Sequence, residues 1–378
     1  MQNRCRFWNF LLGGIFMNEK TVSEEKMRQL GLDLFYGEFV FSDLWFTSKH
    51  FEQKSNRELA DLIVCVGKEM IAFQVKERNT NAEGNLNNWV NEKVEKCKKQ
   101  LRNTYQYLQL DDLKEFANEK GDTVPFGETE VFWGLAILDK QGLAEYPKLK
   151  FSKTLMGFIQ YFSYADFKKC CDQIGTPKDM TEYLGFRQDY FTLDEKKKDS
   201  EDDCIRSFLT EKYGVSNPDK QGMDVFKKFL SDFKDRRVSN FGEEKQYREI
   251  VRFLAYMNRV EIGAFMTCLN NTIYDAKRKC LSYNKCMGPL KNTDSGIIFI
   301  ACEKGITDKI KMVVDLCRYK KRFDCILAAV IYFETDTDYR IDWYYLEQKW
   351  KRSETMESLM NEPELVSLWN GGKKVINN

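Results

Sequence analysis

The sequence has few of the residues and motifs that would assign it quickly to a class of protein. It contains one histidine, His50, and twelve cysteines without a Cys-x-x-Cys pair. A single histidine argues against a Ser-His-Asp triad, and a structural zinc site would need four scattered thiolates. The cysteines form no compact framework of the kind that staples small secreted proteins, so we interpret them as reduced thiols and expect a cytoplasmic protein.

Long apolar runs and glycine-rich phosphate loops are also missing. No segment reaches the ~18 uninterrupted apolar residues of a membrane helix, so no membrane partner is expected. Neither GxxxxGK[ST] nor GxGxxG occurs, which leaves an NTPase or a dinucleotide enzyme without support. Residues 1–16 resemble a signal peptide only weakly, and we interpret them as an N-terminal arm or a wrongly assigned start.

The positive and negative charges nearly cancel, so the molecule as a whole has no strong positive potential that would attract nucleic acid. Lys and Arg number 59 and Asp and Glu number 58, for a formal net charge of +1, so any nucleic-acid site must be a local patch. The 43% hydrophobic and 31% charged composition is typical of a folded globular protein. At 378 residues the chain exceeds the usual size of one domain, and we expect two.

The clearest break in composition is the stretch DEKKKDSEDD at residues 194–203, which contains no apolar side chain. We predict a charged linker there. It would separate a first domain, residues 17–193, from a second domain, residues 204–378. The second domain is predicted to be a mainly helical α+β unit of unknown role, with target recognition, a homodimer interface and contact with a partner protein as open alternatives. Its expected helices cover 204–213, 223–233, 244–272 and 307–319, and its expected strands cover 297–301, 325–333 and 339–345.

The first domain shows an alternation of helical and strand-like patterns. The order is helix, three strands or extended segments, helix and strand, which predicts a mixed sheet flanked by helices. Ser23 is a plausible N-cap for the first helix. The elements are a helix at 23–36, a strand or loop at 38–46, apolar runs at 59–66 and 70–75, a helix at 89–108 and a strand at 132–138, followed by helices at 164–173 and 179–187.

The two apolar runs read as a hairpin around the turn at Gly67 and Lys68. A two-residue turn pairs Val66 with Glu69, and the register then places Asp61 opposite Gln74. Because strand side chains alternate, each face of the hairpin is largely apolar, as in the interior of a sheet covered by helices. One face carries Asp61, Ile63, Cys65, Met70, Ala72, Gln74 and Lys76, and the other carries Leu62, Val64, Val66, Ile71, Phe73 and Val75.

Polar groups in such a hairpin are costly unless they are paired or bind an ion. Asp61, Gln74 and Lys76 gather at one end of it, and Glu58 lies three residues before Asp61. A carboxylate, an amide and an ammonium at the margin of a buried sheet suit a hard, oxygen-liganded cation and an anionic substrate. The alternative interpretation of Asp61 and Lys76 alone is a buried ion pair.

The segment from Asp61 to Gln74-Val75-Lys76 resembles the PD-(D/E)XK nucleases, in the Gln-x-Lys form of the Mrr-like restriction enzymes. The resemblance covers about 120 residues and implies a restriction-endonuclease-like core of order α-β-β-β-α-β. It implies that Asp61, Gln74 and the carbonyl of Val75 hold Mg²⁺, for which Mn²⁺ can substitute. Lys76 would then orient the attacking water and stabilise phosphate charge.

The resemblance also has open positions and departures. The family often adds a glutamate from the first helix, for which Glu25 and Glu38 are both candidates. The proline of the motif is replaced by Ala60. Gln74 stands where an acid is usual, which removes one negative charge from the metal site unless Glu58 compensates.

The helix at 89–108 is the expected nucleic-acid contact. Phosphate contacts from Lys and Arg supply most sequence-independent affinity, and Gln100 lies where related nucleases often place a polar residue near the site. The alternative is a solvated helix face, because Glu92 and Glu95 dilute the charge. The basic, polar and aromatic residues of this helix are Lys93, Lys96, Lys98, Lys99, Gln100, Arg102, Tyr105 and Tyr107.

Three hypotheses for function follow from the sequence. The first is a Mg²⁺-dependent endonuclease that hydrolyses phosphodiester bonds of nucleic acid, with DNA favoured, in restriction or phage defence. The second is a nuclease-fold module that has lost cleavage and binds nucleic acid or a protein partner. The third is a structural or interaction protein in which the polar groups of the hairpin are coincidental.

Overall fold

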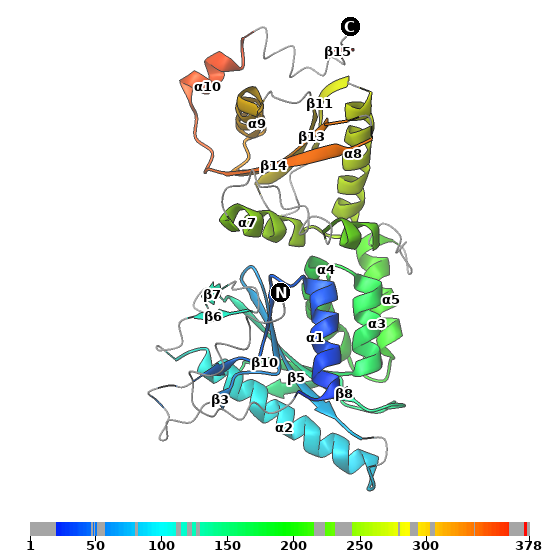
Figure 1. The fold of residues 1–378 in the computed structure, drawn as a ribbon. Helices are drawn as coiled ribbons and strands as arrows, with labels where there is room; N and C mark the ends of the chain where they lie inside the picture. The colour runs from blue at the N-terminus through cyan, green and yellow to red at the C-terminus, as the bar shows by residue number, and fades with distance from the viewer. Residues whose placement is uncertain are drawn as a thin grey trace, which may run out of the picture.

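The structure is a computed structural model, and it describes residues 20–46, 48, 50, 57–79, 82–110, 115–118, 123–125, 129–214, 224–230, 244–278, 280–287, 294–302, 307–335, 337–362 and 374–375. Residues 1–16, interpreted above as an arm, lie outside these ranges. The described chain forms two lobes, each built on its own β-sheet, which lie one above the other in Figure 1. Among the described residues, no helix is both long and apolar enough to cross a membrane.

The first lobe contains a six-stranded mixed sheet, which confirms the expected mixed α/β class. Its three central strands, β5, β8 and β10, are parallel to one another, and the remaining pairs are antiparallel. In spatial order the strands are β1 (Val40–Ser42), β4 (Leu62–Val66), β5 (Glu69–Glu77), β8 (Val131–Asp139), β10 (Gly157–Ser163) and β9 (Leu149–Ser152).

Strands β9 and β10 were not predicted from the sequence. Gln160 interrupts the apolar pattern of β10, yet its side chain is completely buried. Its Nε2 donates to the carbonyl of Leu184 at 2.9 Å and its Oε1 accepts from Arg187 at 3.0 Å. Both partners come from a later helix, so this strand depends on contacts that local pattern does not reveal.

Helices cover both faces of this sheet (Figure 1). The helices of the lobe are α1 (Val22–Phe35), α2 (Leu86–Tyr107), α3 (Tyr164–Ile174), α4 (Pro177–Thr192) and α5 (Glu201–Tyr213). Helix α2 packs on one face, and α1 and α3 pack on the other. Two small ribbons complete the lobe: β2 (Trp45–Phe46) with β3 (Arg57–Glu58), and β6 (Glu115–Ala117) with β7 (Thr123–Pro125).

The N-cap of α1 is Thr21, not the predicted Ser23. The Thr21 hydroxyl accepts from the backbone N–H of Glu24 at 3.2 Å, and the Glu24 carboxylate accepts from the N–H of Thr21 at 2.8 Å. This reciprocal pair is a capping box, which satisfies two N–H groups at the start of the helix. The Ser23 hydroxyl instead donates to Asp139.

The hairpin of β4 and β5 has the predicted register. Val66 pairs with Glu69, Cys65 with Met70 and Ile63 with Ala72. The two side-chain sets also separate as expected: Ile63, Cys65, Met70 and Ala72 pack under α2, whereas Leu62, Val64, Val66, Ile71, Phe73 and Val75 belong to the core under α1 and α3.

The run at 194–203 does not form the predicted linker. Asp194–Lys196 is a turn of 3₁₀ helix, and α5 begins at Glu201 and packs on α3 and α4. Glu201 is buried because the side chain of Arg187 in α4 binds both of its carboxylate oxygens, at 2.7 and 3.0 Å. The charged run therefore belongs to the first lobe, and α5 extends that lobe to Tyr213.

The second lobe is an α+β unit built on a five-stranded sheet, with more strands than the sequence indicated. The spatial order is β14 (Tyr339–Glu347), β13 (Cys325–Phe333), β12 (Ser295–Ala301), β11 (Cys280–Met287) and β15 (Lys374–Val375). Strand β11 was missed because a register shift between Ser282 and Lys285 breaks its alternation. Helices α8 (Arg259–Lys277) and α9 (Thr307–Lys321) lie on opposite sides of the sheet in Figure 1, with α7 (Glu244–Ala255) below and α10 (Glu354–Leu359) beside it.

The helix predicted at 244–272 is two helices. Helix α7 ends at Ala255 and α8 starts after Asn258, whose side chain accepts from the N–H of Glu261 at 3.0 Å. Asn258 is therefore a good N-cap inside what looked like one apolar pattern. The predicted helix at 223–233 is described only at residues 224–230, which are helical.

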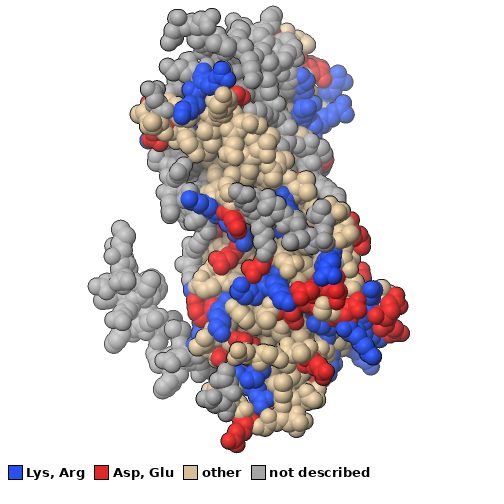
Figure 2. All heavy atoms as spheres, turned by 90° about the vertical axis from the view of Figure 1, so that its right-hand side faces the viewer, with Lys and Arg blue, Asp and Glu red and all other residues tan. Residues whose placement is uncertain are grey.

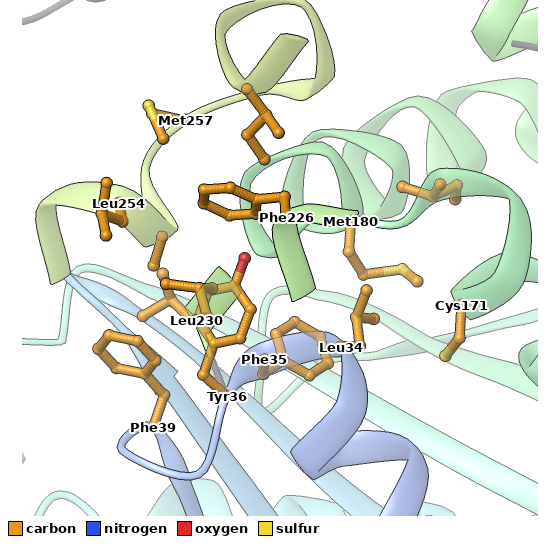
Figure 3. Packing of buried hydrophobic residues seen from close by; sticks show 14 of the residues in the cluster. Leu34, Phe35, Tyr36, Phe39, Cys171, Met180, Phe226, Leu230, Leu254 and Met257 are labelled. Atoms are coloured by element: carbon orange, nitrogen blue, oxygen red, sulfur yellow. The ribbon is translucent and has the colours of Figure 1, made fainter. Parts of the chain in front are cut away.

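An apolar contact joins the two lobes. Figure 3 shows Tyr36 and Phe39, just after α1, near Leu230 and Leu254, with Met257 beyond them; these three residues follow the first lobe in the chain. All five side chains belong to one continuous buried cluster, so the core of the first lobe extends into the second.

The hairpin turn also touches the second lobe. A Cβ on Gly67, which has φ +59°, would lie 1.3 Å from the Tyr256 hydroxyl at the end of α7. The turn therefore faces the second lobe, and β5 runs away from it for seven residues, roughly 23 Å, before it reaches Lys76. The polar end of the hairpin lies at the far end of the first lobe.

Candidate functional site

The structure brings Asp61, Gln74, Val75 and Lys76 together at the end of β5. The Lys76 ammonium lies 2.7 Å from the carbonyl oxygen of Val75, 3.3 Å from Gln74 Oε1 and 3.4 Å from Asp61 Oδ2. Asp61 immediately precedes β4, and its Oδ2 also accepts from the N–H of Val75 at 2.5 Å. Three oxygens of different origin thus converge on one cationic group.

These side chains are buried despite their charge. The side chain of Asp61 is 5% exposed and that of Lys76 is 13% exposed, and Gln74 is 2% exposed. Burial raises the pKa of Asp61 above its ordinary value, while the Lys76 ammonium and the N–H of Val75 oppose this rise. A buried carboxylate is costly to ionise without a positive charge beside it, and the Lys76 ammonium supplies that charge.

Glu58 lies next to Asp61, as the sequence suggested. It belongs to β3 at the surface, where partial desolvation and then the charges of Asp61 and Glu24 raise its pKa to about 7. Lys76 acts in the opposite direction, which places the Glu58 carboxyl within the field of the same site. Near neutral pH, Glu58 therefore exchanges a proton.

The carboxylate of α1 whose charge acts on Asp61 and Glu58 is Glu24. The two candidates from the sequence, Glu25 and Glu38, are not placed to complete the site. Glu25 accepts hydrogen bonds from Arg28 at 2.9 Å and from Gln29 at 2.8 Å along its own helix. These bonds, and the one from Arg28 most of all, lower the pKa of Glu25 to about 2. Glu24, in contrast, raises the pKa of both Asp61 and Glu58.

Glu38 lies at the wrong end of the sheet. Val40 pairs with Val64 and Ser42 with Leu62, so residue 38 falls beyond Val64 toward the hairpin turn. It is buried there and its carbonyl accepts from Asn118 at 3.2 Å. The sequence signal that would have selected Glu24 is the capping box Thr21-x-x-Glu24, which fixes the first turn of α1.

A set of hydrogen bonds holds the start of α1 against the ends of β5 and β8. The Ser23 hydroxyl donates to Asp139 Oδ2 at 2.6 Å, and the N–H of Ser23 donates to Glu77 Oε2 at 3.3 Å. Lys26 adds an ion pair with Asp139 at 3.4 Å. These contacts position Glu24 beside the carboxyl ends of two parallel strands, where α/β proteins commonly place their ligands.

Helix α2 covers the other side of the site. The Thr104 hydroxyl donates to the carbonyl of Leu59 at 2.5 Å, which ties α2 to the segment leading into Asp61. Cys97 is buried and its pKa is raised to about 11, by desolvation first, with Lys76 and Asp61 among its charged neighbours. Gln100 lies between these two positions on the helix, and its Oε1 is buried without a hydrogen-bond partner among the described residues.

The basic residues predicted on α2 differ in their surroundings. Lys93 is paired with Glu92 at 2.6 Å, and Glu95 is paired with Lys150 at 2.8 Å. The exposed cations of the predicted set are Lys96, Lys99 and Arg102. They line the outer side of the helix that covers the site, whereas Lys98 is partly buried.

The oxygen atoms around Lys76 match the ligands of a hard divalent cation. Among the described residues no group of three or more His, Cys, Asp or Glu side chains could hold a metal ion. The set found here instead combines one carboxylate with the amide oxygen of Gln74 and the carbonyl of Val75, all within reach of the Lys76 ammonium. Oxygen ligands of these three kinds are those that Mg²⁺ and related ions accept.

The affinity of a divalent cation bound at this site would depend on pH through Glu58. Because the carboxylate form is needed beside a cation and its pKa is about 7, Mn²⁺ affinity should rise by about tenfold between about pH 6 and about pH 8. Without metal the sign is reversed for stability: the folded chain keeps a proton between the ordinary value of 4.5 and about 7, so its stability falls as pH rises through that window. Calorimetric titration of the protein and of Glu58→Gln with Mn²⁺ measures the affinity at each pH. An equal pH dependence of the affinity in both proteins would contradict the prediction.

The candidate site therefore consists of Asp61, Gln74, Val75 and Lys76, with Glu58 and Glu24 beside them and α2 above. Its geometry provides a cage of oxygens for a cation, a buried ammonium and a proton-exchanging carboxyl at the end of a parallel sheet. Comparison of the chain with models of known families, with curated proteins and with solved structures finds no match.

Proposed function

We propose that the first lobe is a metal-dependent nuclease of the PD-(D/E)XK type, which hydrolyses phosphodiester bonds of nucleic acid. DNA is the first substrate to test. The observation that carries the proposal is the convergence of Asp61 Oδ2, Gln74 Oε1 and the Val75 carbonyl on the Lys76 ammonium. The order of α1, the antiparallel strands, α2 and the parallel strand β8 supports a restriction-endonuclease-like core.

Each group has a role that its position allows. A Mg²⁺ ion held by Asp61, Gln74 and Val75 would polarise the scissile phosphate and activate a water molecule. The Lys76 ammonium, once the ion has taken its place among the three oxygens, would supply positive charge where phosphate charge develops. Glu58 can accept the proton of the attacking water, since its pKa of about 7 is close to neutral pH.

Substrate binding would use the outer side of α2. Lys96, Lys99 and Arg102 are exposed along this helix, and Gln100 lies one turn from Cys97, close to the buried groups. Contacts of this kind bind the phosphate backbone and carry no sequence information. They fit a nuclease that receives its specificity from elsewhere, in keeping with a role in restriction or defence.

A second candidate is a nuclease-like module that binds nucleic acid without cleaving it. One observation favours it: the Lys76 ammonium itself occupies the centre of the oxygen cage, and Gln74 lacks the charge that would attract a divalent ion. The lysine could then neutralise Asp61 permanently. Metal binding distinguishes the two candidates, because only the nuclease requires the ammonium to give way to an ion.

The test is cleavage of plasmid and of single-stranded DNA by the full chain in Mg²⁺, in Mn²⁺ and in EDTA. The proposal expects products with either metal and none in EDTA. Thermal unfolding with and without metal is measured alongside. DNA binding with neither cleavage nor a metal-dependent shift in unfolding temperature would replace the nuclease by the binding module.

A further inference from the structure

The end of α9 and the segment that follows β14 form one surface on the second lobe. The indole N–H of Trp350 donates to the carbonyl of Tyr319 at 2.9 Å, and the two rings stack at 5.7 Å. The backbone N–H of Trp350 donates to Asp324 Oδ1 at 2.6 Å, and the N–H of Ser353 donates to the Tyr319 hydroxyl at 2.9 Å. In Figure 1 the segment between β14 and α10 accordingly passes close to α9.

These contacts bring two basic stretches of the chain together. The stretches 320–322 and 349–352 contain no acidic residue, and all six cations are exposed. Arg352 is paired with Glu357 at 2.9 Å. We call the set the α9 basic platform: Lys320, Lys321, Arg322, Lys349, Lys351 and Arg352.

The platform contrasts with the first lobe, where many cations are paired with acids. On the face shown in Figure 2, Lys and Arg side chains alternate with Asp and Glu over the lower lobe. In the first lobe, for example, Lys169 is paired with Asp202 at 2.7 Å. A chain with a net charge of +1 that gathers six cations in two short stretches concentrates positive potential there.

The helix dipole explains only part of the platform. Lys320 and Lys321 stand at the C-terminal end of α9, where cations offset the partial negative charge of the helix. Lys349, Lys351 and Arg352 belong to a segment outside any helix, and the hydrogen bonds of Trp350 and Ser353 bring them to the same place. The dipole gives no reason for this second group.

The aromatic residues restrict what the platform can recognise. One face of the Trp350 ring is stacked on Tyr319, and the guanidinium of Arg322 lies over the Trp350 ring at 5.4 Å from its centre. These neighbours leave less of the indole open for stacking on an unpaired base. Clustered cations with little open aromatic surface beside them suit the phosphates of a duplex.

We propose that the α9 basic platform binds the phosphate backbone of duplex DNA, independently of sequence. This inference goes beyond the nuclease proposal, because the platform lies on the second lobe and β5 carries the candidate site to the far end of the first. The second lobe then contributes affinity for the polymer and does not complete the site around Lys76.

The test is fluorescence anisotropy of a labelled duplex of about 30 base pairs with the full chain in EDTA, where the proposed nuclease cannot act. Replacing Lys321, Lys349 and Lys351 by Ser should weaken binding by at least about tenfold at ~0.1 M salt. The slope of log affinity against log salt should fall by up to about 2.7, since each lost phosphate contact removes about 0.9.

The matched control replaces three exposed lysines of the first lobe, Lys153, Lys168 and Lys198, by Ser, which changes the net charge equally. It should retain affinity and slope. Equal losses in both variants, unchanged binding in the platform variant, or binding of the platform to anionic lipid vesicles in preference to DNA would each overturn the inference. Because binding is measured in EDTA and cleavage is measured with metal, failure of this inference and failure of the nuclease proposal remain distinguishable.

Discussion

Lys76→Met should lower the rate of metal-dependent cleavage by about 10²- to 10³-fold, the usual effect of removing one group that stabilises charge in a transition state. Methionine keeps the length of the side chain and its packing beneath α2, but it supplies no charge to the phosphate. Asp61→Asn should have an effect at least as large, because it removes the only carboxylate among the three proposed metal ligands. The asparagine oxygen can still accept from the N–H of Val75, which keeps the start of β4 in place. The measurement is the initial rate of plasmid nicking under saturating Mg²⁺.

Lys68→Met is the matched control for this prediction. Lys68 flanks the same strand at its other end, where its side chain is 67% exposed and paired with Glu130. The cleavage rate of this variant should equal that of the unchanged protein. Full activity in Lys76→Met or Asp61→Asn would show that the oxygen cage is not where cleavage occurs.

Glu201→Gln should destabilise the first lobe by about 3–5 kcal/mol, because it leaves the Arg187 guanidinium buried without a counter-charge. Both side chains are 0% exposed, and the guanidinium binds Glu201, Gln160 and the carbonyl of Tyr161. The Tyr183 hydroxyl of α4 donates to the same carboxylate at 2.5 Å, so the change weakens the contact between α4 and α5. The free energy of unfolding from a urea titration, followed by circular dichroism, measures the loss.

A surface pair between two of the same helices provides the comparison. Lys169 of α3 and Asp202 of α5 lie 2.7 Å apart with side chains that are 46% and 42% exposed. Asp202→Asn should change stability by no more than about 1 kcal/mol, as expected for solvent-screened pairs. The double variant Arg187→Met with Glu201→Leu should recover much of the loss, since it leaves no unpaired charge. If Glu201→Gln and Asp202→Asn reduced stability equally little, the buried pair would not hold α5 to the lobe.

The hairpin was predictable because its signals are local. The turn at Gly67 sets the register over the next few residues, and alternation assigns each side chain to a face. Asp61, Gln74 and Lys76 are 15 residues apart at most, so their meeting follows from one turn. The choice between Glu24, Glu25 and Glu38 was different, because it depends on how α1 lies on β5 and β8, more than 40 residues further along the chain.

The charged run at 194–203 shows the opposite case. A stretch without apolar residues normally remains in solvent, because ionised groups are costly to bury. Glu201 is buried only because Arg187, Tyr183 and Lys148 surround its carboxylate from α4 and from the segment before β9. A sequence pattern shows that a residue is charged and therefore costly to bury. It does not show which distant residues will pair with that charge.

The sequence by itself determined the hairpin, its two faces and the gathering of Asp61, Gln74 and Lys76, since backbone pairing and alternation operate over a few residues. Only the tertiary structure decided which carboxylate of α1 acts on Asp61 and that α5 belongs to the first lobe. It also decided the five-stranded sheet of the second lobe and the grouping of residues in the α9 basic platform. Each of these depends on contacts between segments far apart in the chain, whose free energy is set by burial and by the partners that meet there.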